Sequence, residues 1–176
     1  ASNHTPALWE ILGDAGRRSC VLNVPVTYPP RPFNGEMVTG LLTPADRDDF
    51  TYPASLRDAL RSAIPDYVVW PASMYQSYGR EEAFLDAADR LFDQGSRLFR
   101  FMQARGPWDF QMIVFMPVDR VQHALWHYRD PSHGAYPADA PARLRDAVDW
   151  VHDEYGVTYT YLMAAAVIVT IPVVIL

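Results

Sequence analysis

The chain has 176 residues, which is enough for one ordinary domain with a hydrophobic core. Hydrophobic residues make up 49% of it and charged residues 20%, and this balance excludes an intrinsically disordered protein. The net charge of −6 argues against a nucleic-acid partner, because binding to a phosphate backbone is driven largely by an excess of basic residues.

The N-terminal third combines short apolar segments with a long stretch rich in proline and glycine. Pro6–Ala15 is predicted to be a helix, since its apolar residues recur at helical spacing and Gly16 can end it. Cys20–Val24 is typical of a short buried strand, in which the single cysteine is expected to be a buried, inert thiol. Pro25–Pro53 shows no sustained period, and an irregular stretch of that length is usually a lid or a substrate-facing loop.

The middle of the chain carries the longest helical pattern and the most convincing strand. Glu81–Arg105 has an apolar stripe at helical spacing, and Phe110–Met116 is a continuous apolar run typical of a central parallel strand. Shorter patterns predict a strand at Tyr67–Trp70 and helices at Ser55–Ala63, Arg120–Tyr128 and Pro141–Tyr155. Because strands alternate with helices, the predicted fold class is α/β, with a mostly parallel sheet and flanking helices.

The last twenty residues differ in kind from the rest. Val157–Leu176 contains no charged residue, and as a helix of about 1.5 Å rise per residue it could just cross a bilayer core of about 30 Å. A buried terminal strand or helix is the alternative. We therefore expect a domain at 1–156 followed by an apolar, C-terminal helix at 157–176. No secretory signal opens the chain, so 1–156 is expected to be cytoplasmic, with membrane association through 157–176.

One constellation of polar residues directly follows the predicted central strand, at the end where open α/β sheets place their sites. Asp119 and His123 are four residues apart on a predicted helix, and so are His123 and His127. Residues at this spacing share a helix face, and a carboxylate oxygen with an imidazole nitrogen suits a cation such as zinc. A surface contact between Asp119 and His123 is the alternative. His127 is a candidate third ligand or substrate-side contact, or else packs on Trp126 or faces solvent.

A set of short segments spread over residues 7–155 occurs in an order that is familiar from one group of enzymes. These segments are Leu8–Leu12, Val21–Pro30, Asn34–Gly35, Met37–Pro44, Thr51–Pro53, Trp108–Asp109 and Val118–Trp126. Together they resemble bacterial proteins of the alkaline phosphatase superfamily, of the predicted phosphodiesterase or nucleotide pyrophosphatase type. The resemblance implies an interior part of an alkaline-phosphatase-like fold and metal-dependent hydrolysis of a small-molecule phosphate ester.

The resemblance also implies which residues carry the chemistry. Such enzymes use two divalent metal ions, commonly zinc or manganese, and a Thr or Ser nucleophile that is transiently phosphorylated. Their Asp-x-x-x-His motif, which ligates one metal, falls on Asp119 and His123, and Asn34 and Thr39 fall on the substrate side. The family's nucleophile and its other metal ligands have no counterpart in the matched segments. This chain alone is therefore expected to be inactive.

The apolar tail resembles a different family. Tyr161–Val174 is similar to the last membrane helix of sugar-type ABC importer permeases. Two alternatives to the hydrolase follow, namely a membrane-anchored, non-catalytic binding module and a fusion with a permease tail. Because a sheet that lacks neighbouring strands exposes its edges and apolar faces, self-association is also expected.

Overall fold

The computed structural model describes residues 5–71, 74 and 79–153, and these belong to two compact units. The first unit contains residues up to Trp70 together with 94–114, and the second contains the described residues of 71–93 and 115–153. Helix α3 (Glu81–Ala104) contributes its first half to the second unit and its second half to the first. The predicted apolar helix at 157–176 lies outside the described residues. Among the helices that are described, none is both long and apolar enough to cross a membrane.

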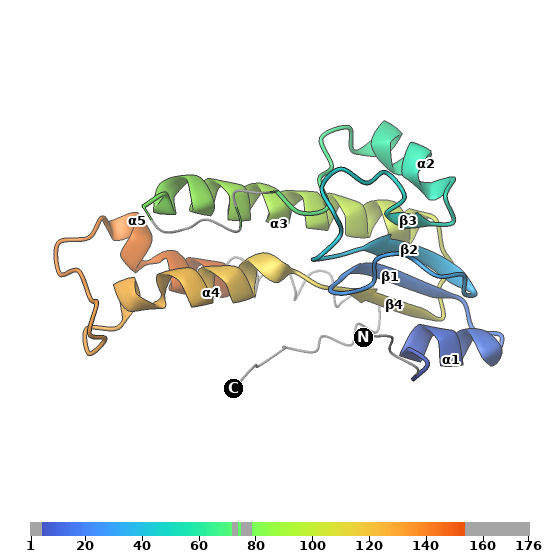
Figure 1. The fold of residues 1–176 in the computed structure, drawn as a ribbon, viewed down its shortest axis with the longest axis horizontal. Coiled ribbons are helices and arrows are strands. Elements are labelled where there is room, and N and C mark those ends of the chain that lie inside the picture. Colours follow the sequence, from blue (N-terminus) through green and yellow to red (C-terminus); the bar gives the residue numbers. More distant parts are fainter. Residues whose placement is uncertain (1–4, 72–73, 75–78, 154–176) are drawn as a thin grey trace. The chain divides into compact units, whose positions relative to one another are not determined.

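The first unit is built on a four-stranded sheet with the strand order β3-β2-β1-β4 (Figure 1). Its strands are β1 (Ser19–Val24), β2 (Gly35–Thr39), β3 (Thr51–Tyr52) and β4 (Phe110–Ile113). Strand β1 pairs in parallel with β2 on one side and with β4 on the other, while β3 is antiparallel to β2. The predicted α/β class and mostly parallel sheet are therefore confirmed. Cys20 is fully buried on β1, and burial raises the pKa of its thiol well above the ordinary value, as expected for an inert cysteine.

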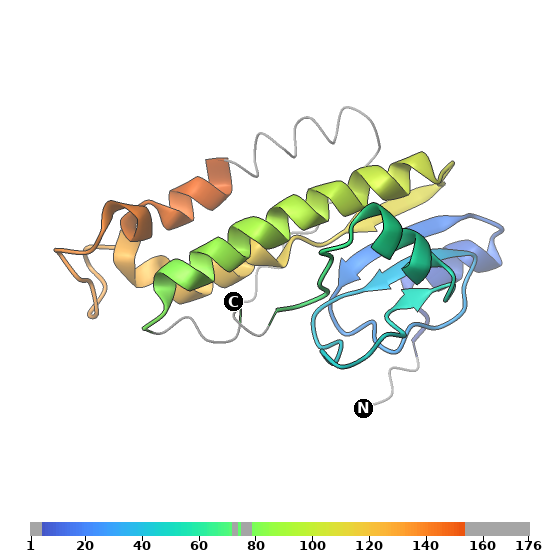
Figure 2. The ribbon, with the colours of Figure 1, turned by 90° about the horizontal axis from the view of Figure 1, so that it is seen from above.

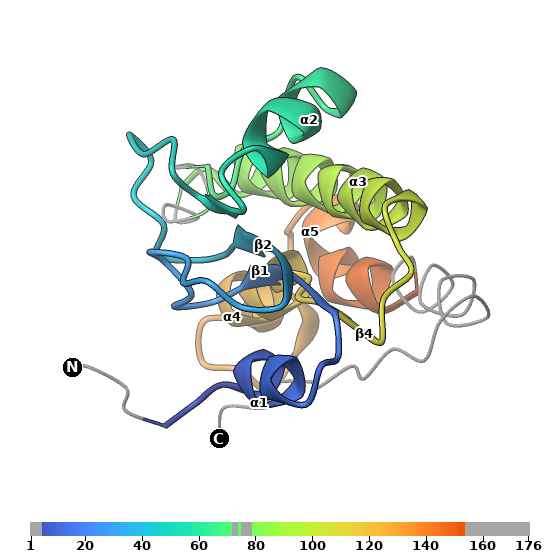
Figure 3. The same cartoon turned by 90° about the vertical axis from the view of Figure 1, so that its right-hand side faces the viewer.

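Helices cover both faces of this sheet. Helix α1 (Leu8–Asp14) lies on one face, and α2 (Leu56–Ala63) lies with the second half of α3 on the other (Figure 3). Their apolar spacing explains the packing, since α2 buries side chains one turn apart and α3 buries a continuous stripe. The buried side chains are Leu56 and Leu60 on α2 and Leu98, Phe99 and Met102 on α3. All three helices agree with the prediction within a few residues at their ends.

Two segments of the first unit differ from the prediction. Residues Pro25–Pro53 are not one irregular loop, because they contain β2 and β3. Tyr67–Trp70 is not a strand. The Val68 N–H donates to the side-chain oxygen of Gln94 at 3.3 Å, whereas in a strand it would donate to a backbone oxygen of the neighbouring strand.

The second unit is helical. It consists of the first half of α3, α4 (Met116–Arg129), α5 (Ala142–Arg145) and the helical residues 147–153, and α4 runs alongside α3 (Figure 2). Arg143 of α5 donates to Glu82 at 2.5 Å and to Asp86 at 2.6 Å, which links α5 to α3. A bend at Asp146 divides the helix predicted for Pro141–Tyr155 into two. The core of this unit consists of Phe84, Leu85, Ala88, Val121, Leu125, Leu144, Val148 and Val151.

Candidate metal centre

The two predicted metal ligands lie near the start of α4. Strand β4 ends at Ile113 and α4 begins at Met116, so the strand is shorter and the helix longer than predicted. Pro117 favours this early start, because its φ angle is already helical and the first turn does not need its missing N–H. Asp119 falls in that first turn, where the unpaired backbone N–H groups favour a carboxylate.

The structure brings the side chains of Asp119 and His123 together. His123 Nε2 lies 3.2 Å from Asp119 Oδ1, and the two side chains are 59% and 31% exposed, respectively. A tetrahedral zinc ion with ligand bonds of about 2.0–2.1 Å separates neighbouring ligand atoms by about 3.3 Å. The observed distance therefore fits one edge of a zinc coordination shell. It is also the length of a hydrogen bond, which is what joins the two side chains without a metal.

The opposite face of α4 is buried in the core of the second unit, to which the helix belongs. Pro117, Val121 and Leu125 recur at four-residue spacing and are all buried. Arg120 Nη2 donates to the backbone oxygen of Met74 at 3.1 Å. Because the apolar stripe faces inward, the stripe that carries the carboxylate and the imidazole faces outward. The local sequence thus places both candidate ligands on the accessible side of the helix.

His127 does not join this pair. Its ring packs against Tyr128, with 4.1 Å between ring centroids, and lies 6.0 Å from the ring of His133. Within residues 5–71, 74 and 79–153, no group of three or more His, Cys, Asp or Glu side chains could hold a metal ion. Asp119 and His123 thus form a pair, whereas a zinc site normally takes three or four ligands from protein.

Two of the predicted substrate-side residues, Asn34 and Thr39, do not lie together. Asn34 directly precedes β2 and Thr39 ends it, so they are about 16 Å apart at about 3.3 Å per residue. Asn34 is exposed, and its Nδ2 donates to the backbone oxygen of Arg17 at 3.1 Å. Thr39 is fully buried, donates from its hydroxyl to Phe50 O at 3.1 Å and lies 2.8 Å from the Thr43 hydroxyl. The Thr39 hydroxyl is therefore engaged within the fold.

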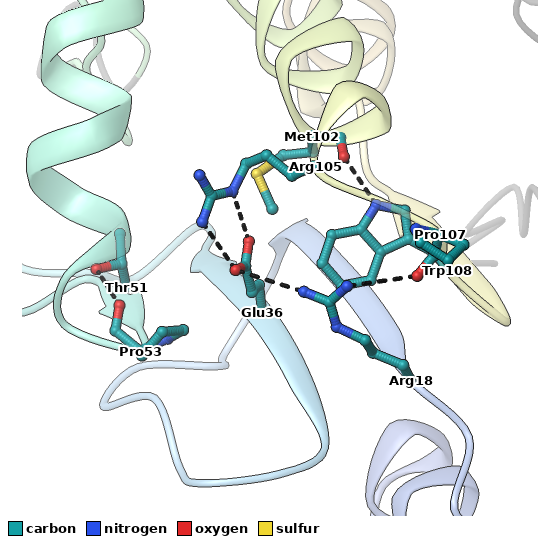
Figure 4. Close-up of polar contacts among 8 residues, drawn as sticks. All are labelled: Arg18, Glu36, Thr51, Pro53, Met102, Arg105, Pro107 and Trp108. Carbon is teal, nitrogen blue, oxygen red and sulfur yellow. Dashed lines mark hydrogen bonds and ion pairs between the residues drawn. The ribbon is translucent and has the colours of Figure 1, made fainter.

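A buried ion pair lies near the amino-terminal end of β2, whereas α/β proteins place their sites at the carboxyl ends of the strands. Glu36 of β2 is 7% exposed and accepts hydrogen bonds from Arg105 at 2.8 and 2.9 Å (Figure 4). Arg18 Nη2 lies 3.7 Å from the same carboxylate, and the Arg18 guanidinium lies 4.0 Å from the centre of the Trp108 ring. The bidentate pair joins the end of α3 to β2, and we interpret the cluster as structural.

Other residues on α4 escaped the sequence analysis. Gln122 Nε2 lies 2.6 Å from His152 Nε2, which connects α4 to the helical residues 147–153. Trp126 is exposed and lies three residues after His123, and the sequence points to it only as a packing partner of His127 and as the end of the Val118–Trp126 segment. The spacing of positions 119, 123 and 126 indicates this residue, because residues three or four apart lie on the same face of a helix.

Asp119 Oδ1 and His123 Nε2 can together coordinate a cation, or they can form a hydrogen bond with each other. No family model, no curated protein and no solved structure matches this chain. The alkaline phosphatase superfamily therefore stays an expectation that rests on the resemblance of the segments described above. What the structure adds is the geometry of Asp119 and His123.

Proposed function

We propose that this chain is an interior part of a metal-dependent phosphate-ester hydrolase of the alkaline phosphatase superfamily, of the phosphodiesterase or nucleotide pyrophosphatase type. One observation supports the proposal most strongly, namely the 3.2 Å approach of His123 Nε2 to Asp119 Oδ1 on the accessible face of α4. The donor types, their separation and their exposure are those that a zinc or manganese half-site requires.

In this proposal, Asp119 and His123 supply two ligands to one divalent cation. When bound, such a cation polarises a phosphoryl oxygen and stabilises the charge of an in-line displacement. The remaining ligands and the nucleophile come from groups outside the described residues. The chain by itself accordingly binds metal without turning over a phosphate ester.

A calorimetric titration of the full chain with zinc tests the proposal. We expect one zinc to bind, and we expect Asp119→Ala and His123→Ala each to weaken binding by about tenfold or more, because each removes a ligand. Asp89→Ala and His133→Ala are matched controls, since both residues are exposed and lie outside the pair. Equal zinc affinity in all five proteins would contradict the proposal.

A further inference from the structure

The two edge strands of the sheet differ in how they are protected against pairing with a further strand. Strand β3 has only two residues, and Pro53, which has no N–H, follows it. Strand β4 has four residues, Phe110–Ile113, without a charge, a proline or a bulge. Natural sheets use short strands, charges, prolines and bulges to keep an edge from pairing. Within the described part of the chain, β4 lacks these features and pairs only with β1.

The hydrogen bonds between β4 and β1 determine which backbone groups of β4 point away from the sheet. The Val114 N–H, directly after β4, donates to Leu22 O of β1 at 3.0 Å. Successive residues of a strand direct their backbone groups to opposite sides, so Met112 also directs its N–H and C=O to β1. The N–H and C=O groups of Gln111 and Ile113 therefore point outward from this edge.

The register of the sheet shows on which face each side chain of β4 lies. Glu36 of β2 and Gln111 of β4 both align with Cys20 of β1, so these side chains share a face. Glu36 accepts hydrogen bonds from Arg105, directly after α3, so this face is the one that α3 covers. Met112 follows Gln111 and is half-buried on the opposite face, which carries α1 (Figure 3).

The outward backbone groups of β4 are arranged symmetrically about Met112. In an antiparallel pair of two β4 strands centred on this residue, Gln111 of one copy lies opposite Ile113 of the other. Each such pair exchanges two N–H···O bonds, so the two pairs form four. The two Met112 residues then form a non-hydrogen-bonded pair with Cα atoms about 4.5 Å apart. One two-fold axis thus satisfies the outward groups of Gln111 and Ile113 in both strands.

Charge and exposed apolar surface favour a second copy as the partner of this edge. Residues 110–116 carry no charge, so two chains of net charge −6 can meet there without opposing like charges. A strand pair of this length covers less than the roughly 1,200 Å² of a stable interface, so further surface has to contribute. Leu8 and Ile11 of α1 are 51% and 52% exposed, and the two-fold axis places both α1 helices on the face of Met112.

We infer that two copies of this chain associate through β4, which pairs antiparallel with β4 of the second copy across a two-fold axis at Met112. The two four-stranded sheets then form one continuous sheet of eight strands. The inference does not rest on the proposed function, because none of the residues that carry it belongs to α4.

Charge substitutions at the axis test this arrangement by sedimentation equilibrium of the full chain, which we expect to be a dimer. Met112→Lys and Met112→Glu each place like charges opposite one another and should raise the dimer dissociation constant at least about tenfold. An equimolar mixture of the two variants should dimerise again, because lysine then lies opposite glutamate. Val68→Lys is the control, since Val68 is exposed on the first unit outside β4 and its substitution should leave the dimer unchanged.

A disulfide at the axis tests the register. Two Met112→Cys chains bring Cα atoms to about 4.5 Å, which a disulfide can span, so oxidised glutathione should convert this variant into a covalent dimer. Phe110→Cys is the matched control, because position 110 lies two residues from the axis. Its two copies are about 14 Å apart, which is too far for a disulfide.

Several results would overturn the inference. A monomeric parent would assign this edge to another occupant, such as residues 157–176, or to none. A mixture of Met112→Lys and Met112→Glu that stays monomeric would show that the two side chains do not meet. Unchanged dimerisation of each variant alone, or equal cross-linking of Phe110→Cys and Met112→Cys, would exclude a two-fold axis at Met112.

Discussion

Among the described residues, three other than glycine have a left-handed backbone. They are Asn23, Val26 and Leu42, with φ angles of 57°, 63° and 76°. All three lie at the carboxyl ends of β1 and β2, where the Val26 N–H donates to Leu41 O at 3.0 Å and links the two connections. Asparagine tolerates this conformation, whereas a β-branched side chain is strained in it by about 1–2 kcal/mol.

Val26 is the residue at which relief of this strain is easiest to measure. Its side chain is 74% exposed, so removing it sacrifices little apolar burial. We predict that Val26→Asn raises the free energy of unfolding by about 1 kcal/mol, measured by urea denaturation. Val68→Asn is the control, because Val68 is also exposed but does not have a left-handed backbone. An unchanged or lowered stability of Val26→Asn would contradict the prediction.

Asp66 gives the folded state a dependence on acid. It accepts hydrogen bonds from Arg97 at 3.0 and 2.7 Å, and chiefly these hold its pKa below the ordinary 3.8. A carboxyl whose pKa is lower in the folded than in the unfolded state stabilises the fold above about pH 4. That contribution is lost as the pH falls through the folded pKa.

We therefore predict that Asp66→Asn unfolds more easily than the parent at neutral pH and loses less stability on acidification below about pH 4. Urea denaturation at pH 7 and at pH 3 measures both effects. Asp58→Asn serves as the control, because Asp58 is also exposed on the first unit. If Asp66→Asn lost as much stability between pH 7 and pH 3 as the parent, the contact between Asp66 and Arg97 would not be the cause of the acid dependence.

At the scale of elements, the sequence predicts those whose apolar pattern is regular. Helices α2 and α3 show an uninterrupted helical period, and β1 is a plain apolar run. Strand β2 could not be predicted because Glu36 interrupts its apolar run. That carboxylate is held in the sheet chiefly by Arg105, which lies 69 residues away in the chain. A partner at that distance leaves no local signal.

The Glu36–Arg105 pair makes a prediction about how β2 and α3 are held together. Arg105→Met leaves a mostly buried carboxylate with only the longer contact to Arg18 at 3.7 Å, and we expect it to cost about 3 kcal/mol. The double variant Glu36→Met with Arg105→Met removes the unpaired charge and should be less destabilised than Arg105→Met alone. Chemical denaturation of the parent and the two variants measures this, and a double variant at least as destabilised as Arg105→Met would contradict it.

The connection after β2 depends on a glycine. A Cβ at Gly40 would lie 2.2 Å from Asn23 O and 2.5 Å from Val24 O, both of them backbone atoms. We predict that Gly40→Ala lowers the free energy of unfolding by about 2 kcal/mol or more, because the two loops must move apart. Gly134→Ala is the control, since a Cβ there meets nothing within 4 Å and its cost should be near zero. Similar stability of the two variants would refute the close approach.

The positions of the candidate site residues could be predicted only where the helix or strand that carries them could be predicted. Asp119 and His123 lie on one regular helix, so their four-residue spacing was enough to bring them together. Asn34 directly precedes an unpredicted strand and Thr39 is its last residue, so their separation depends on where β2 begins and ends. The ring of His127 lies 6.0 Å from that of His133, and this contact depends on the conformation of the loop after α4, which leaves no local signal in the sequence.

At the scale of the whole molecule, the parallel sheet and the candidate ligands belong to different units. The sheet lies in the first unit, and Asp119, His123 and Trp126 lie in the second, where α4 presents them on one face. The metal binding proposed for Asp119 and His123 therefore involves side chains of the second unit. By mass action, zinc that binds the folded state raises its stability, by about 2.7 kcal/mol at a hundredfold excess over Kd.

The most direct test of the metal site is nuclear magnetic resonance of the side-chain nitrogens of the five histidines as zinc is added to the full chain. We predict that the largest change occurs at Nε2 of His123, the atom that lies beside Asp119 Oδ1, and that Asp119→Ala abolishes it. His133 should not respond. A titration in which His123 is silent, or in which it responds equally without Asp119, would contradict the assignment of this pair as a metal half-site.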